Sequence, residues 1–416
     1  TRLFATANKD GIYNNSEIYG HGLMDLAAAT APVGQVSAML GQDLSGPMTS
    51  AAFTSIHLTN PSFGDSISRG INNETVIFFD ELQAPFRRPL NGIISEYRNQ
   101  IMNLNGYDEV DNHNVKTSIT EDSFFQVGLS SYSNHSNELI TPYHLLNIKS
   151  ANEQYFAYFN HEKNTFMSHG INAGWALGIF QDELLRSKIN LRSKFNNPWM
   201  NFTAAGTSFG SIKEIDENLN LALTISSGRN KFKSNEIFGD TNTSSLALIE
   251  LQTNSAIPSL QLGLLKENDS QMGLSGSGAL NGQGNQLTSF LGITNSINIF
   301  GGKFFGSLYW GQTADSKNEA SMISSINDIH SSSFGLGYLK SSVFQKNDLL
   351  TLTIDQPIRV ESGNLNLEVP VYRTKKKNVL FNLLNINLRP SGREINSNLE
   401  YSSSFKILDY GIALGY

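Results

Sequence analysis

Short segments that alternate apolar and polar residues fill the sequence from about Phe124 to the end of this 416-residue chain. A period of two places the apolar side chains of a β-strand on one face of a sheet. Clusters of Asn, Ser, Gly and Asp separate the segments and predict turns. There are on the order of a dozen segments of about ten residues, the length that a membrane-spanning strand needs. The clearest lie at 219–225, 350–354, 365–369 and 383–388.

Two architectures fit this alternation: a closed β-barrel in an outer membrane, and a soluble all-β protein. The polar positions separate them, because the wet face of a soluble sheet carries many Lys, Glu and Asp. Here those positions hold mostly Asn, Ser, Thr and Gly, and only 16% of the chain is charged. Small neutral residues suit a lumen, whereas Leu, Ile, Phe, Tyr and Trp suit lipid and its interfaces. The sequence therefore predicts an all-β fold, an antiparallel up-and-down outer-membrane β-barrel.

Composition excludes several classes of function. The net charge of −7 gives no patch for a polyanion, so we expect no nucleic-acid partner. No run of eighteen apolar residues occurs, so the sequence predicts no transmembrane helix. The chain has no cysteine, which suits passage through an oxidising periplasm and removes thiolate metal sites and cysteine nucleophiles.

A glycine-punctuated turn, a short helix and a proline stop follow one another at 18–34. Gly20 and Gly22 can supply positive φ angles or a close backbone approach. Residues 24–30 are rich in helix formers, and Pro32 ends the segment because it lacks an N–H. A self-standing domain seldom opens in this way. We expect this to be the last helix of a domain whose body precedes residue 1.

Three runs in this region, LFATAN (3–8), GIY (11–13) and YGHGLMDL (19–26), resemble the closing segment of subtilisin-like serine peptidases. In that family the catalytic domain ends on "TA…YGxGxxDxxxA", and the following PVG (32–34) resembles the version found in autotransporters. An unrelated amphipathic helix after a loop remains the alternative. The run 76–88 is similar to an "FDxxxxPF" element that follows the protease domain in those autotransporters.

The tail carries a second resemblance to the same family. DQPIRVESG (355–363), LRPSGREI (388–395) and LEY (399–401) are similar to the "QPxRVxSG" and "PxGRExxxxxxY" elements at the barrel end of subtilisin-like autotransporters. Such barrels usually continue further and stop on an aromatic residue. This sequence stops at Tyr416, which could be the natural insertion signal, but we expect the barrel to be truncated at its end.

Residues 41–122 predict a connecting region with short strands and one helix. The helix is predicted over 93–104, where apolar residues recur at three- and four-residue spacing. It is a candidate plug for the pore. A polar loop is predicted over 106–122.

One motif imitates a catalytic site. Gly206-Thr207-Ser208 matches the start of "GTSxAxP", which holds the nucleophile of subtilases, but Gly210-Ser211-Ile212 replaces the rest. The surrounding residues predict a strand and a hairpin. The motif also follows the domain-end segment, whereas the family's nucleophile precedes it. The sequence therefore predicts a structural role for Ser208.

Other candidate sites are equally weak. The eight histidines lie scattered in predicted turns and loops, and none is placed with an Asp for general-base chemistry. His21 lies between two turn glycines, which indicates a structural role. The glycine-rich run at 273–284 lacks the Lys-Ser/Thr of a phosphate loop and predicts a flexible barrel loop. We predict no catalytic, cofactor-binding or metal-binding residue, and no cofactor.

The resemblance implies three parts. Residues 1–40 would be the C-terminal end of a subtilisin-like protease domain, 41–122 a linker, and 123–416 an autotransporter-type β-barrel. The chain would be the translocation and outer-membrane anchoring module of a secreted serine protease from a Gram-negative bacterium. The parent would be a serine endopeptidase whose catalytic triad lies outside these residues.

The implied partners are outer-membrane lipid, the outer-membrane assembly machinery and protein substrates of the protease domain. We expect a monomer in the outer membrane, with its N-terminal passenger at the cell surface or outside the cell. The alternative is a standalone porin-like barrel or a surface adhesin without protease activity. A soluble repeat protein is a third reading.

Overall fold

The computed structural model describes most of the chain. The described residues are 2–40, 48–50, 55–58, 61–95, 113–119, 123–131, 152–160, 164–170, 173–186, 191, 194–229, 243–253, 257–281, 284–318, 321–346, 348–405 and 408–415.

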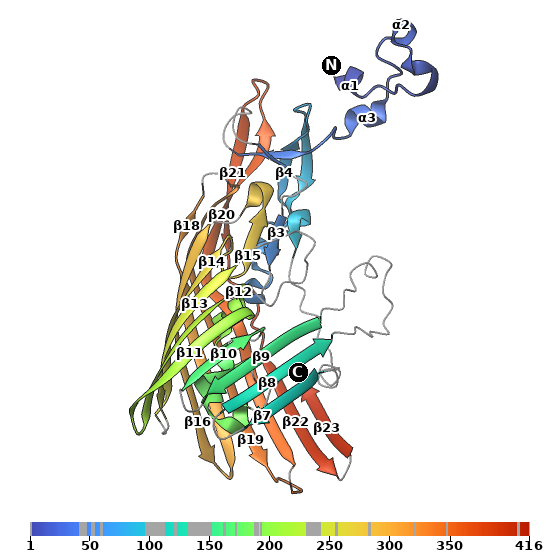
Figure 1. Cartoon of the computed structure of the whole chain (residues 1–416). Helices are drawn as coiled ribbons and strands as arrows, with labels where there is room; N and C mark the ends of the chain where they lie inside the picture. Colours follow the sequence, from blue (N-terminus) through green and yellow to red (C-terminus); the bar gives the residue numbers. More distant parts are fainter. Residues whose placement is uncertain are drawn as a thin grey trace.

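A 16-stranded antiparallel sheet forms the body of the molecule (Figure 1), which confirms the predicted all-β class. Its strands pair almost entirely in sequence order. The path is β7 (His113–Ile119), β8 (Ser123–Ser131), β9 (Asn152–Asn160), β10 (Thr165–His169), β11 (Ala205–Asp216), β12 (Leu219–Arg229), β13 (Ser244–Thr253), β14 (Ser259–Asn268), β16 (Asn285–Ile299), β17 (Gly302–Thr313), β19 (Ile323–Ser341), β20 (Leu349–Arg373), β22 (Asn396–Phe405) and β23 (Leu408–Gly415). Two further strands, β18 (Ser316–Lys317) and β21 (Val379–Asn387), pair with β19 and β20.

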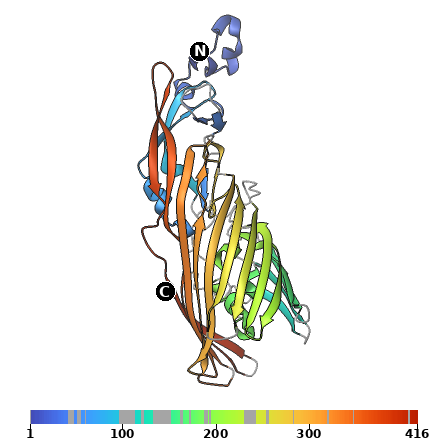
Figure 2. The same cartoon turned by 90° about the vertical axis from the view of Figure 1, so that its left-hand side faces the viewer.

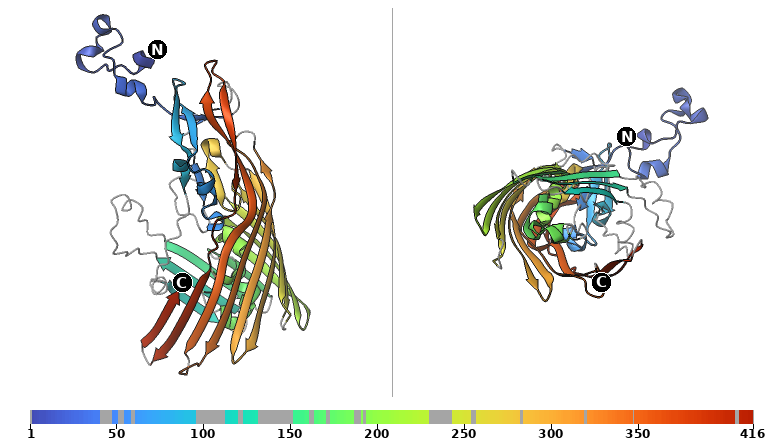
Figure 3. Two further views of the ribbon diagram at one scale, coloured as in Figure 1. Left: turned by 180° about the vertical axis from the view of Figure 1, so that it is seen from behind. Right: turned by 60° about the horizontal axis from the view of Figure 1, so that its bottom comes forward.

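The sheet curls around an interior (Figure 3). Between its terminal strands, β7 and β23, the described residues form no ladder. The strand connections differ at the two ends. At the lower end of Figure 1 strands follow each other closely, as at Asp216–Leu219 and Ile299–Gly302. At the upper end they are joined across long stretches such as 170–204, 269–284 and 374–395.

The upper half of β20 pairs with β21 and rises above the body of the sheet (Figure 2). Against this hairpin lies a second sheet, in the order β2-β1-β4-β5, with bounds β1 (Ser37–Met39), β2 (Met48–Ser50), β4 (Thr75–Phe79) and β5 (Pro85–Pro89). Met39, Ile77 and Phe79 form a buried cluster with Val379 of β21. The N-terminal part of the chain is therefore docked on the last third of the chain.

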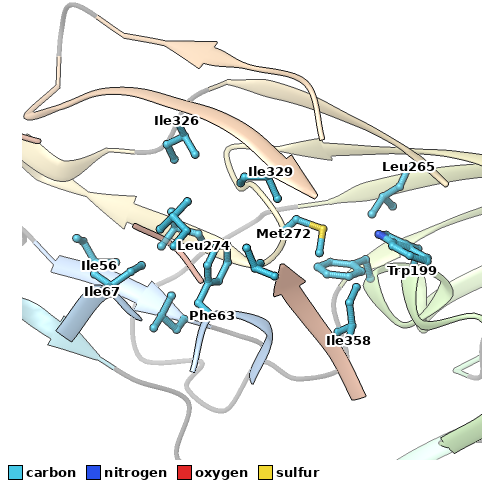
Figure 4. Close-up of a cluster of buried hydrophobic side chains, with 14 of the residues drawn as sticks. Ile56, Phe63, Ile67, Trp199, Leu265, Met272, Leu274, Ile326, Ile329 and Ile358 are labelled. Atoms are coloured by element: carbon cyan, nitrogen blue, oxygen red, sulfur yellow. The ribbon is translucent and has the colours of Figure 1, made fainter. Parts of the chain in front are cut away.

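A third, small sheet joins β3 (Ser55–Leu58), β6 (Ile94–Ser95) and β15 (Leu274–Ser277). Beside it lie η3 (Pro61–Phe63), α4 (Ser66–Gly70) and η4 (Leu90–Ile93). Figure 4 shows Phe63 and Ile67 among buried side chains that include Leu274 and Ile326. The segment predicted as a linker thus contributes buried side chains to the main hydrophobic core.

The first helices stand apart from the sheets at the top of Figure 1: α1 (Arg2–Ala5), η1 (Gly11–Asn14), α2 (Ser16–Tyr19) and α3 (Leu26–Thr30). The predicted turn is confirmed, with φ of 60° at Gly20 and 102° at Gly22. A Cβ at Gly22 would lie 2.4 Å from the carbonyl oxygen of Asn8, so the close approach needs glycine. Asp25 caps α3 by accepting a hydrogen bond from the Ala28 N–H at 2.9 Å. These helices do not by themselves show a protease fold.

Two predictions about the connecting region are wrong where the structure describes it. Strand β7 lies inside the predicted loop at 106–122, so the large sheet begins before residue 123. The predicted helix at 93–104 is replaced at 93–95 by the end of η4 and by β6, which pairs with β3. At 94–95 pairing with the distant strand β3 overrides the helical pattern, whereas β7 pairs with β8, the next strand along the chain. Residues 96–104, on which the predicted plug mainly rests, lie outside the described residues.

Candidate functional site

A continuous band of exposed apolar side chains covers the outer face of the curled sheet. Its members lie 36% to 63% exposed on strands from β11 to β22, and neighbouring members face each other across the ladders. We call these residues the apolar band: Phe209, Leu223, Ile225, Ile249, Leu251, Leu262, Leu264, Leu287, Phe304, Trp310, Leu336, Leu352, Ile354 and Leu399. Apolar patches of this extent are rare on soluble monomers and mark interaction surfaces.

Two open grooves cross this band. One, of about 570 Å³, runs between Phe304, Leu336, Leu352 and Leu399. The other, of about 480 Å³, is lined by Tyr158, Met167, Phe209, Leu223 and Ile225 at the opposite side of the band. Both lie on the sheet's outer face and are walled mainly by aliphatic and aromatic side chains. They can accept long apolar groups, and they offer no charged side chain for a polar ligand.

The inner face carries smaller polar side chains on several strands. On β12, Leu223 and Ile225 point outward, whereas Thr224 and Ser226 are buried on the inside. The predicted sidedness, with apolar residues outside and small neutral polar residues inside, is confirmed for this strand. On β13 the inner positions also include Leu246 and Leu248, because other parts of the chain pack there.

The outward side chains of strand β20 change from apolar in its lower half to polar in its upper half, and we call this change the face exchange of β20. In its lower half Leu352 and Ile354 are exposed outside, and Thr351 and Thr353 are buried inside. In its upper half, between 364 and 369, the apolar residues are buried and the polar ones face outward. The buried residues are Leu365, Leu367 and Val369, and the outward ones are Asn364, Asn366 and Glu368. The outward side chains of β20 are therefore apolar at 352–354 and polar at 364–368, while Tyr372, Leu380 and Leu383 of the upper hairpin are also exposed.

The boundary between these halves is fixed by a cluster of charged side chains. Arg359 of β20 is 7% exposed and donates to the carbonyl oxygens of Gly392 at 3.1 Å and Pro390 at 3.0 Å. Glu361 forms ion pairs with both Arg359 and Arg393. The two motifs that resemble autotransporter elements, 355–363 and 388–395, therefore contact each other through these groups. The contacts hold the chain between β21 and β22 against β20.

Part of the chain between β10 and β11 lies inside the curled sheet (Figure 3). It consists of η6 (Ala173–Ala176), η7 (Gly178–Gln181), α6 (Glu183–Arg186) and η8 (Pro198–Thr203). We call the described residues between 173 and 204 the inner segment. Its large aromatic side chains are at most 1% exposed: Trp175, Phe180, Phe195, Trp199 and Phe202.

Aromatic side chains of the wall hold the inner segment. The Trp199 ring stacks on Phe290 of β16, with centroids 5.0 Å apart and planes within 3°. Phe195 meets the edge of Phe305 of β17 at 4.9 Å. Such pairs add stability beyond the area that they bury.

Polar contacts also hold the inner segment against the wall. Glu250 of β13 is fully buried and accepts from the Gly178 N–H at 2.9 Å and from Gln181 Nε2 at 3.0 Å. Asn197 Nδ2 donates to Gln261 Oε1 of β14 at 2.9 Å. Lys303 of β17 pairs with Asp182. The inner segment is therefore tied to three strands of the wall.

At the upper end, Asp80 links the N-terminal helices to the second sheet. Its carboxylate pairs with Arg2 at 2.6 Å and accepts from the N–H groups of Val33 at 3.0 Å and Ala84 at 2.8 Å. Desolvation alone would raise the pKa of Asp80, but these hydrogen bonds and the Arg2 charge outweigh it, and the pKa lies below 3.8.

The sequence motifs singled out above behave differently in the structure. Ser208 lies on β11, in the predicted hairpin with β12, and its fully buried Oγ hydrogen-bonds to Ser226 Oγ at 2.8 Å. His21 stacks on Phe4, with centroids 4.1 Å apart. Within the described ranges, no three His, Asp or Glu side chains are grouped so that they could hold a metal ion.

The loop predicted from the glycine-rich run at 273–284 is wrong at its start. Leu274–Ser277 form β15, which pairs with β3 residue by residue and is buried at Leu274 and Ser275. A Cβ at Gly276 would lie 1.5 Å from the Leu280 carbonyl oxygen, so a bulkier residue could not take this path. The glycine here serves a close backbone approach inside a strand.

Sequence reasoning missed the inner segment and its anchors. Glu250 is the one signal that was available, because an acidic residue interrupts the apolar positions of LALIELQ (246–252). Inside an alternating strand such a residue indicates a buried polar partner.

Among the described residues, no helix is long and apolar enough to cross a lipid bilayer. A scan against protein-family models finds no family that matches the sequence, and a search of curated proteins finds no matching protein.

Proposed function

We propose that the chain is an outer-membrane β-barrel that anchors its N-terminal segment on the outer side of the membrane. The apolar band is the observation that carries this proposal. Full burial of a large aliphatic side chain is worth about 1.5–3 kcal/mol, and in water each half-exposed member of the band would forgo roughly half of that. Lipid offers that burial without a protein partner, and the band extends over the outer face of successive strands from β11 to β22.

The face exchange of β20 supports the same reading. A single strand has outward Leu352 and Ile354 below the charged cluster, and outward Asn366 and Glu368 above it. A strand that leaves a membrane and enters water changes its outer side chains in this way. The Arg359 cluster lies where lipid headgroups would be.

The directions of the terminal strands are compatible with closure into a barrel. Strand β7 runs from the upper end to the lower end, and β23 runs from the lower end to the upper end. They would therefore pair in the antiparallel sense. Closure is required in hydrocarbon, because each unpaired backbone group costs several kcal/mol there.

The two ends of the sheet favour one orientation. Outer-membrane barrels have short turns toward the periplasm and longer loops outside. The close strand connections at the lower end would then face the periplasm. The N-terminal helices, near the upper end, would lie at the cell surface.

The resemblance to subtilisin-like autotransporters gives the proposal its finer content. We propose that residues 1–40 end a protease domain, that 41–122 connect it, and that the remainder translocates and anchors it. The parent would be a secreted serine endopeptidase with its triad outside 1–416. The exposed apolar residues of the first helices fit such a neighbour: Leu3, Phe4, Ile18, Met24 and Leu26 are 47% to 71% exposed.

The test is refolding of the purified chain into detergent micelles and lipid vesicles. We expect a band in gel electrophoresis that migrates differently before and after boiling, and protection of the body from proteases in vesicles. A chain that stays monomeric and folded without detergent or lipid would refute the membrane assignment.

The family assignment is tested separately: a "GTSxAxP" motif encoded shortly before Thr1 would support it, and a signal peptide there would support a standalone barrel.

A further inference from the structure

We infer that the inner segment is a resident plug, which prevents the barrel from conducting ions while it is in place. This goes beyond anchoring, although it rests on the proposed membrane location. Three independent sets of contacts place the plug in the lumen: the packing of Trp199 and Phe195 against the wall, the hydrogen bonds to Glu250, and the ion pair between Asp182 and Lys303. We call the wall positions that receive the two rings the aromatic seats.

The wall is shaped to receive the plug. At Gly311 of β17 an added Cβ would lie 2.3 Å from Cζ2 of Trp199, and at Gly335 of β19 it would lie 2.7 Å from Cε1 of Phe195. Both glycines occupy inward positions of their strands. A side chain at either position would occupy the space of a plug ring, so glycine is required at both for the two rings to lie where they do.

The polar anchors are also specific. The Glu250 carboxylate is surrounded by neutral donors: the Gly178 N–H, Gln181 and Gln261. Two of these donors belong to the plug and one to the wall. A buried acid without a cation is costly unless such donors satisfy it, so the plug and the wall stabilise each other at this point.

Behind the plug, the wall is lined by neutral hydrophilic groups. The inward positions of successive strands include Thr224, Ser226, Gln252, Gln261, Thr294, Ser307, Ser333 and Thr353. A polar cavity of about 300 Å³ lies on the lower side of η7, between Gln181, Asp182, Thr294 and Lys303. With the plug displaced, this surface would form a hydrophilic conduit for small hydrated ions.

The experiment measures conductance of the full chain in planar phospholipid bilayers bathed in potassium chloride. The parent chain should be almost always closed. Glu250→Ala leaves the plug donors unpaired and should increase the open time about tenfold or more, the factor that corresponds to one lost charged hydrogen bond. Gly311→Leu, which removes the Trp199 seat, should have the same effect.

The matched control is Glu267→Ala on the neighbouring strand β14. Glu267 is as buried as Glu250, but it holds a turn at the upper end by accepting from Ser270 Oγ at 2.9 Å and the Met272 N–H at 2.8 Å. This variant should conduct like the parent. If Glu250→Ala does not fold, Lys303→Ala, which removes the partner of Asp182, replaces it in the test.

Two results would overturn the inference. One is a parent chain that already conducts as freely as the variants. The other is an inserted Glu250→Ala or Lys303→Ala chain that stays closed. Heat-modifiable migration and insertion are recorded in parallel. A chain that does not insert would refute the membrane proposal itself, and the plug inference would fail with it.

Discussion

Gly311 lies directly under the indole of Trp199. A Cβ at position 311 would be 2.3 Å from Cζ2 of that ring, closer than carbon atoms approach without displacement. The same indole stacks on Phe290 and meets the edge of Tyr309 at 6.5 Å. Neighbouring rings therefore limit the movement of the indole, and the absence of a side chain at 311 is a condition for this packing of the inner segment.

We expect Gly311→Ala to destabilise the folded chain by about 1–3 kcal/mol, the usual cost of overpacking a tight core. The measurement is urea unfolding in detergent, followed by tryptophan emission, which should also shift in the folded state as Trp199 moves. Gly392→Ala is the control, since nothing lies within 4 Å of its added Cβ. We expect it to stay within about 0.5 kcal/mol of the parent. Equal unfolding midpoints for the two variants would contradict the described fit.

The face exchange of β20 supplies a matched pair of substitutions on one strand. Leu352→Lys places a charge in the apolar band and should cost about 2–4 kcal/mol in a bilayer, the range for lipid-facing charges near the midplane. Glu368→Lys changes an outward residue of the upper half and should cost less than about 0.5 kcal/mol. Unfolding in phospholipid vesicles measures both. Similar losses at the two positions would show that the band does not face lipid.

Much of the sheet is readable from the sequence, because alternation and turn residues act locally. The strands at 219–225 and 350–354 are examples, and the hairpin around Ser208 follows from the same signals. For the upper half of β20, which face is buried is not readable in this way. The upper and lower halves of β20 alternate with the same period, and only the packing of β4 and η3 behind the upper half decides its inner face.

Strand β15 and the inner segment, both missed, depend on partners that are distant in sequence. Leu274–Ser277 become a strand because Ser55–Leu58 lie beside them. The inner segment has no periodic pattern, and its place is set by seats on β16, β17 and β19. Local propensity does not contain such information.

The Arg359 cluster can be tested by its effect on the chain between β21 and β22. Arg359→Gln removes the charged donor to the Gly392 and Pro390 carbonyl oxygens, a loss of about 1.5–3 kcal/mol for such hydrogen bonds. We expect the bond after Arg393 to become about tenfold more sensitive to trypsin, since the loop is then free to open. Arg229→Gln on the outer face of β12 is the control and should leave that cleavage rate unchanged. Equal cleavage rates in the two variants would show that the Arg359 cluster does not hold this part of the chain against β20.

The lowered pKa of Asp80 predicts that the attachment of the N-terminal helices to the second sheet depends on pH. Its pKa is lowered in the folded chain by the Val33 and Ala84 N–H groups and by Arg2, which outweigh the effect of burial. A lowered pKa means that the unfolded state binds the proton more readily, so this carboxylate stabilises the attachment above its ordinary pKa of 3.8. That contribution is lost as the pH falls from this value through the lower pKa of the folded state.

Hydrogen exchange of residues 2–33 between pH 5 and pH 2 measures the effect. Because exchange itself slows toward low pH, protection is compared with that of a peptide of the same sequence. In the parent, protection should fall in the acid range named above. Asp80→Asn should show weaker protection at pH 5 and a flatter profile, whereas Asp10→Asn, at an exposed position, should follow the parent. A parent profile as flat as that of Asp80→Asn would mean that the Arg2–Asp80 contact does not hold the N-terminal helices in place.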